Sequence, residues 1–115
     1  MVSPGLLSNT PALIVICQHM VEMQKRGGDF RCKFLTIADS AMAAQNIMLA
    51  AHDLGLGTCV IASFHCQGVQ QILQLPEEIV LMLLISVGIP AKPVKAPNRK
   101  EDLIWFNEYN QSNRN

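Results

Sequence analysis

The feature that most constrains the fold is a long helix predicted in the middle of the chain, from Thr36 to Leu54. The stretch is rich in alanine, the residue that most favours helix. Thr36 and Asp39 have the spacing of a capping box at its start, and Gly55 is placed to end it in the left-handed conformation. At about 1.5 Å per residue the helix is about 30 Å long, enough to cross a whole domain.

Apolar or small side chains surround this helix almost completely, with Gln45, Asn46 and His52 as the interruptions. A helix of this kind needs packing partners on more than one side. We therefore expect it to lie at a subunit interface. A central core helix within one chain is the alternative.

Three short apolar runs, rich in β-branched residues, predict strands. They are Ala12–Cys17, Gly57–Ile61 and Ile79–Val87. The first and third are apolar on both faces, which predicts burial on both sides, and the third is expected inside its sheet.

The connections between these runs differ in character. Met20–Lys33 is charged and contains Gly27-Gly28, so we expect a mobile connection with at most one helical turn. Gln67–Leu73 predicts a short helix that ends before Pro76.

The whole chain, 1–115, is predicted to be a single domain, with an arm or loop at 1–10 and an extended segment at 92–115. Within that segment, Lys100–Tyr109 has the composition of a short helix.

Composition excludes several classes of protein. Half of the residues are apolar and 16% are charged, which excludes a disordered chain. Nine basic and nine acidic side chains balance, so no excess charge is available for nucleic acid. The first basic residue is Lys25, unlike a signal peptide, and the run Ile79–Val87 is too short to cross a bilayer. We expect a soluble, cytoplasmic protein that binds neither nucleic acid nor membrane.

The four cysteines, Cys17, Cys32, Cys59 and Cys66, contain no CxxC pair. Structural zinc sites usually carry two closely spaced ligand pairs, so no metal is predicted and free thiols are expected. No catalytic constellation is recognisable either. A cysteine-based redox protein is a further hypothesis, which requires one exposed, reactive thiol.

Lys and Arg are absent from the middle of the chain. No Lys or Arg occurs from Phe34 to Ala91, whereas Lys92, Lys95, Arg99 and Lys100 follow within nine positions. Prolines stiffen this segment, and the planar guanidinium of Arg99 is suited to paired hydrogen bonds with an anion such as phosphate. A solvated surface loop is the alternative interpretation.

The block from Asp39 to Cys59, DSAMAAQNIMLAAHDLGLGTC, resembles the central helix and following turn of the nitroreductase family of FMN-dependent oxidoreductases. The similarity continues at Leu75-Pro76, at Ser86–Pro90 and at Pro97–Lys100. It covers roughly residues 11 to 109 and corresponds to the C-terminal half of that family.

This resemblance implies an α+β fold with a mixed sheet flanked by helices, assembled as a homodimer in which the long helix packs against its partner. It implies FMN at the subunit interface, reduced by NAD(P)H and reoxidised by a nitroaromatic, quinone or similar acceptor. By position, Arg99 matches the arginine that grips the FMN phosphate. Ile61, Ala62 and Ser63 match the stretch whose backbone N–H groups approach the flavin ring.

The chain departs from the family at its start, where the arginine-rich motif that binds FMN in relatives has no counterpart before Ala12. This departure supports an alternative hypothesis: a truncated, flavin-free dimer with the same fold, acting as a binding or scaffold module.

Overall fold

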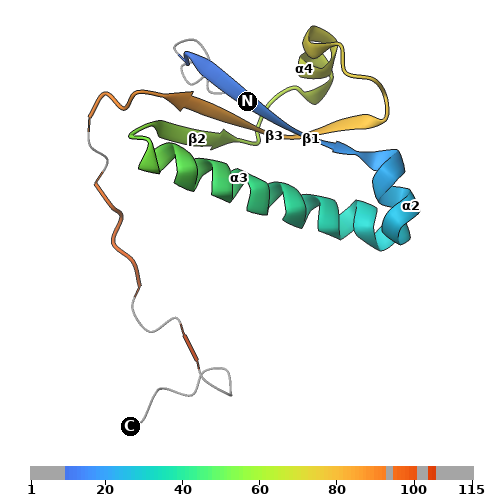
Figure 1. The fold of residues 1–115 in the computed structure, drawn as a ribbon, viewed down its shortest axis with the longest axis horizontal. Coiled ribbons are helices and arrows are strands. Elements are labelled where there is room, and N and C mark those ends of the chain that lie inside the picture. The colour runs from blue at the N-terminus through green and yellow to red at the C-terminus, as the bar shows by residue number, and fades with distance from the viewer. Residues whose placement is uncertain (1–9, 93–94, 101–103, 106–115) are drawn as a thin grey trace.

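The computed structural model describes residues 10–92, 95–100 and 104–105, and its centre is a three-stranded sheet (Figure 1). The strands are β1 (Ala12–His19), β2 (Gly57–Ile61) and β3 (Ile79–Gly88), in the order β1-β3-β2. The last strand in sequence therefore occupies the middle of the sheet, as its uniformly apolar sequence predicted.

The strand directions show that two strands with the same direction flank a third strand with the opposite direction. Both β1 and β2 pair antiparallel with β3, so they run in the same direction with β3 inserted between them. The α+β class is confirmed. Where a mixed sheet was expected, neighbouring strands among the described residues are all antiparallel, because β3 separates the two strands that share a direction.

Two helical segments and a π-helical turn connect β1 to β2. They are α2 (Met20–Phe30), η1 (Arg31–Leu35) and α3 (Thr36–Asp53). The expectation of a mobile connection over Met20–Lys33 was wrong, because the glycines kink the helical run without ending it. The kink is at Gly28, with φ 60° and ψ −155°. Exposed ion pairs, Glu22–Lys25 at 3.1 Å and Asp29–Lys33 at 3.8 Å, support the segments on either side of it.

The predicted end of α3 is confirmed, whereas its predicted N-cap is not. The capping role of Thr36 was wrong: helical backbone precedes it, and its hydroxyl donates to the Cys32 carbonyl at 2.7 Å. At the other end Gly55 has φ 75°, as predicted. The N–H groups of Gly55 and Leu56 donate to the carbonyls of His52 and Ala51, the two bonds of a Schellman motif.

One side of α3 packs on the sheet. Its buried residues, Thr36, Ser40, Ala44 and Ala51, form a stripe at helical spacing. The Gln18 side-chain amide on β1 donates to the Ser40 hydroxyl at 3.1 Å, which ties the helix to the edge strand. Met42 and Leu49, on the opposite side of the helix, are exposed.

By length and composition alone, the helical stretch Cys32–Asp53 could also cross a membrane. Core helices of soluble proteins can have the same length and apolar composition. In this structure the stripe that begins at Thr36 is covered by the sheet.

On the opposite side, α4 (Cys66–Leu73) lies over part of the sheet and closely matches the helix predicted over Gln67–Leu73 (Figure 1). Ile61, Leu81 and Leu84 form the buried cluster on this face. Leu81 and Leu84 share a face because the register shifts: Ile16 lies opposite Leu83 and Cys17 opposite Leu81, so Met82 has no partner.

Burial of β1 on both faces was wrong. Leu13 and Ile14 are 41% and 37% exposed, and β1 is an edge strand. Apart from Thr10, the arm expected at 1–10 falls outside the described residues, as does most of the helix expected over Lys100–Tyr109. The single-domain assignment stays a prediction.

Candidate functional site

The candidate site begins where β2 ends. Ile61 is the last residue of the strand, lies opposite Leu84 and is buried in the core cluster. Ala62 and Ser63 follow in an irregular loop, and both are exposed. In the part of the chain that the structure describes, the Ser63 backbone N–H has no hydrogen-bond partner. The loop therefore presents an exposed, unpaired donor to whatever lies beside it.

Two residues fix the far end of this loop. Phe64 packs against the cluster of Ile61, Leu81 and Leu84. His65 is the N-cap of α4: its Nδ1 accepts the Gly68 N–H at 3.0 Å. A Cβ at position 68 would lie 3.0 Å from the same nitrogen, so glycine permits this close approach. Ala62 and Ser63 are thus held between a strand end and a capped helix.

The capping role of His65 was not predicted, although its position before a short helix was the available sequence feature. His19 has a similar place at the junction of β1 and α2, and its Nδ1 accepts the Glu22 N–H at 3.4 Å.

Arg99 is separated from these residues. It is exposed and lies in the irregular segment 95–100, which runs away from the sheet in Figure 1. Within one chain the structure brings together Ile61, Ala62 and Ser63, and it does not bring Arg99 to them.

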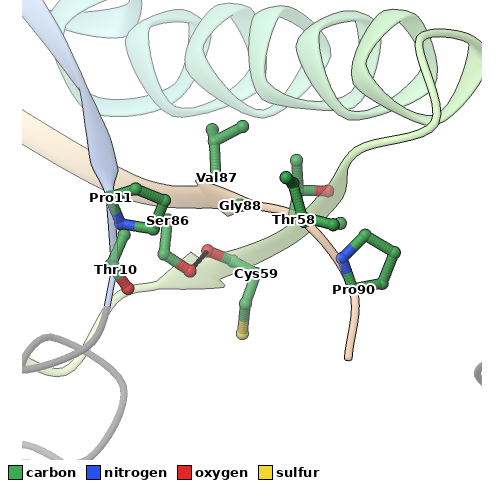
Figure 2. A pocket seen from close by; sticks show the side chains of 10 residues that line it. Thr10, Pro11, Thr58, Cys59, Ser86, Val87, Gly88 and Pro90 are labelled. Carbon is green, nitrogen blue, oxygen red and sulfur yellow. Dashed lines mark hydrogen bonds between the residues drawn. The ribbon is translucent and has the colours of Figure 1, made fainter. Parts of the chain in front are cut away.

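A groove of about 550 Å³ lies at the other end of β2 (Figure 2). It is bordered by the starts of β1 and β2 and by the end of β3. The Ser86 hydroxyl on its floor donates to the Cys59 carbonyl at 3.3 Å. None of the residues that line it is charged, so the groove itself offers no cation for a phosphate.

The cysteines lie in different environments. Cys59 is exposed, whereas Cys17, Cys32 and Cys66 are partly buried. Burial, and secondarily the neighbouring Cys66 thiol, raise the pKa of Cys17 above its ordinary value. Among the described residues, no group of three or more His, Cys, Asp or Glu side chains could hold a metal ion.

Comparison with known proteins decides the family. The family model described as "Nitroreductase family" matches residues 3–89, which include all three strands and the β2–α4 loop. The chain belongs to the nitroreductase family. The matched range ends before Arg99.

Individual nitroreductase relatives agree with this assignment. The FMN reductase (NADPH) of Bacillus subtilis is 32% identical over 97 residues, covering 81% of this chain and 38% of that protein. The crystal structure of a nitroreductase family protein from Clostridium novyi NT has 32% identity and a TM-score of 0.61, over 71% of this chain and 44% of that one.

A third comparison concerns the fold alone. The NfrA1 nitroreductase of B. subtilis has a TM-score of 0.73 at 24% identity, over 94% of this chain and 50% of that one. The chain spans less than half the length of the curated relatives that it matches.

Proposed function

We propose that this chain acts as an FMN-dependent oxidoreductase of nitroreductase type. It would pass electrons from NAD(P)H through the flavin to a nitroaromatic, quinone or similar acceptor. The observation that carries the proposal is the family match across the β2–α4 loop, where Ser63 presents its unpaired N–H. The FMN reductase (NADPH) of B. subtilis supports both the flavin and the nicotinamide.

The residues of the loop suit the ring end of FMN. A flavin ring needs a flat approach and N–H donors at its polar edge, and an exposed loop with small side chains offers both. Ile61 anchors this loop in the core, so the donors of Ala62 and Ser63 are held in place. When bound, FMN would accept hydride from NAD(P)H and pass electrons to the acceptor.

The phosphate of FMN needs a cation. Arg99 is suitable because its planar guanidinium group can donate hydrogen bonds to two phosphate oxygens at once. Within a single chain the segment 95–100, which contains Arg99, runs away from the sheet (Figure 1). The proposal therefore requires either that segment 95–100 turns back on binding or that a second copy contributes Arg99.

A homodimer is part of this proposal. Met42 and Leu49 are exposed on the side of α3 that faces away from the sheet, and a second α3 would cover them. Such a pair would place two β2–α4 loops and two basic segments in one assembly. We propose a cytoplasmic location, where reduced nicotinamide is available.

The visible absorption spectrum of the purified protein tests the proposal directly. We expect bound flavin, either as purified or after incubation with FMN followed by gel filtration. Arg99→Ala should weaken flavin retention at least tenfold, whereas Lys95→Ala, another exposed cation of the same segment, should change it little. Equal retention by the two variants would remove Arg99 from the site.

A protein that stays colourless after reconstitution would overturn the flavin proposal. If that protein is also a stable dimer, the alternative hypothesis of a flavin-free binding or scaffold module is supported. The separation of Arg99 from the loop favours this second candidate.

A further inference from the structure

Two of the four cysteines converge on one face of the sheet. Cys17 lies near the end of β1, and Cys66 is the first residue of α4. Both side chains pack against the buried cluster of Ile61, Leu81 and Leu84. Residues 49 positions apart in sequence thus pack against the same buried cluster.

The bulge in β3 explains why Cys17 reaches this cluster. Cys17 lies opposite Leu81, and Val15, two residues earlier on the same face, lies opposite Leu84. With Met82 unpaired, Leu81 and Leu84 point to the same side, beneath the start of α4. The electrostatic influence of Cys66 on the Cys17 thiol agrees with this placement.

The other two thiols lie elsewhere. Cys59 is opposite Ser86, five residues along β3 from Leu81, which corresponds to about 16 Å at the rise of a strand. Cys32 is in η1, where its thiol donates to the Gln24 side-chain carbonyl at 3.0 Å. Disulfides join Cα atoms about 4 to 7 Å apart, and Cys17 and Cys66 are the two cysteines that pack on this cluster.

We propose that Cys17 and Cys66 form a reversible disulfide that fastens the start of α4 to β1. The reaction is exchange with a small-molecule disulfide such as oxidised glutathione. One cysteine thiolate attacks a glutathione sulfur and releases one glutathione thiolate. The second cysteine attacks the mixed disulfide and releases the other glutathione, so the protein loses two electrons and two protons, and two molecules of glutathione are formed.

This bond would act on the loop described above. Cys66 directly follows His65, so a covalent link at Cys66 restricts the far end of the Ala62–Ser63 segment. The inference does not depend on flavin binding, because it concerns two core-facing thiols and needs no cofactor.

The test uses the folded protein equilibrated with graded ratios of oxidised to reduced glutathione, then blocked with iodoacetamide. Peptide mapping without reduction should find one intramolecular link, between the peptides that contain Cys17 and Cys66. The double variant Cys32→Ser, Cys59→Ser should form this link as the original chain does. Cys17→Ser and Cys66→Ser should each abolish it.

A second measurement separates a native pair from random oxidation. At the same glutathione ratio, linked chains should exceed unlinked ones by a factor at least tenfold larger in the folded protein than in concentrated urea, because the fold holds the two thiols together. Equal factors would overturn the proposal, as would oxidation that links other cysteines. Circular dichroism of each serine variant confirms that a lost link does not reflect a lost fold.

Discussion

Replacing His65 with alanine should loosen the first turn of α4 and the loop before it. In the structure the imidazole Nδ1 accepts the Gly68 N–H at 3.0 Å. Alanine has no acceptor, so this donor loses its partner. The backbone of the preceding loop then loses one of the two attachments that fix its far end.

The size of the effect follows from the exposure of this hydrogen bond. Losing an N-cap side chain costs about 0.5 to 2 kcal/mol of unfolding free energy. Because the bond is exposed, water can take over the Gly68 N–H, and we expect the lower half of that range, about 0.5 to 1 kcal/mol. For a domain of this size this is a decrease of about 2 to 8 °C in Tm.

Thermal unfolding followed by circular dichroism measures the change, and hydrogen exchange at the Gly68 amide locates it. His65→Asn should recover most of the loss, since asparagine is among the best N-cap residues. His52→Ala, at an exposed histidine in the last turn of α3, is the matched control and should change Tm little. The reasoning fails if alanine and asparagine at position 65 are equally destabilising, or if His65→Ala behaves as His52→Ala does.

Three further predictions concern the scaffold. Ile85→Ala should lower the free energy of unfolding by about 2 to 5 kcal/mol, because Ile85 is 0% exposed. The same change at Ile72, 81% exposed, should cost less than about 0.5 kcal/mol, and urea denaturation measures both. Gly55→Ala should cost about 1 to 2 kcal/mol by thermal unfolding, because φ is 75° there; an effect below that of Ile72→Ala would contradict this. Burial raises the pKa of Cys17 above 9.0, so its contribution to stability is present below pH 9.0 and is lost as pH rises through the folded pKa. Urea denaturation at alkaline pH should show this loss, and Cys17→Ala should remove it.

Sequence patterns predicted the bounds of the strands better than their burial. Gly57–Ile61 has the observed bounds, and the third strand differs by one residue, because β-branched runs between glycines and prolines define strands locally. The burial of β1 was wrong because an apolar run carries no information about strand order. Leu13 and Ile14 are exposed since β1 is at an edge.

The start of the long helix illustrates a second limit. Thr36 and Asp39 have the spacing of a capping box, but an N-cap residue has non-helical backbone angles, and Thr36 lies within the helix. The preceding residues continue the helix through η1, so the Thr36 hydroxyl bonds back to Cys32 instead. Glycines and charges between Met20 and Lys33 favoured a loop locally, whereas the helical run continues across the kink at Gly28 with an ion pair on either side of it.

The candidate site could be predicted only in part. Ile61, Ala62 and Ser63 are adjacent in sequence, so their association needs no tertiary information. Whether Arg99 meets them depends on a segment with few contacts in one chain, and neither composition nor spacing decides that. The capping histidine was missed because histidine is an uncommon N-cap and its role depends on the rotamer.

The central position of β3 has a consequence for biosynthesis. β1 and β2 do not touch each other, and every ladder hydrogen bond of the described sheet involves β3. During translation, therefore, no strand pairing of this sheet can form until β3 has begun to leave the ribosome, and the ladder is complete only after residue 88. Until then Ile14 and Val60 lack their partner on β3, so both are open to a chaperone that binds extended apolar segments.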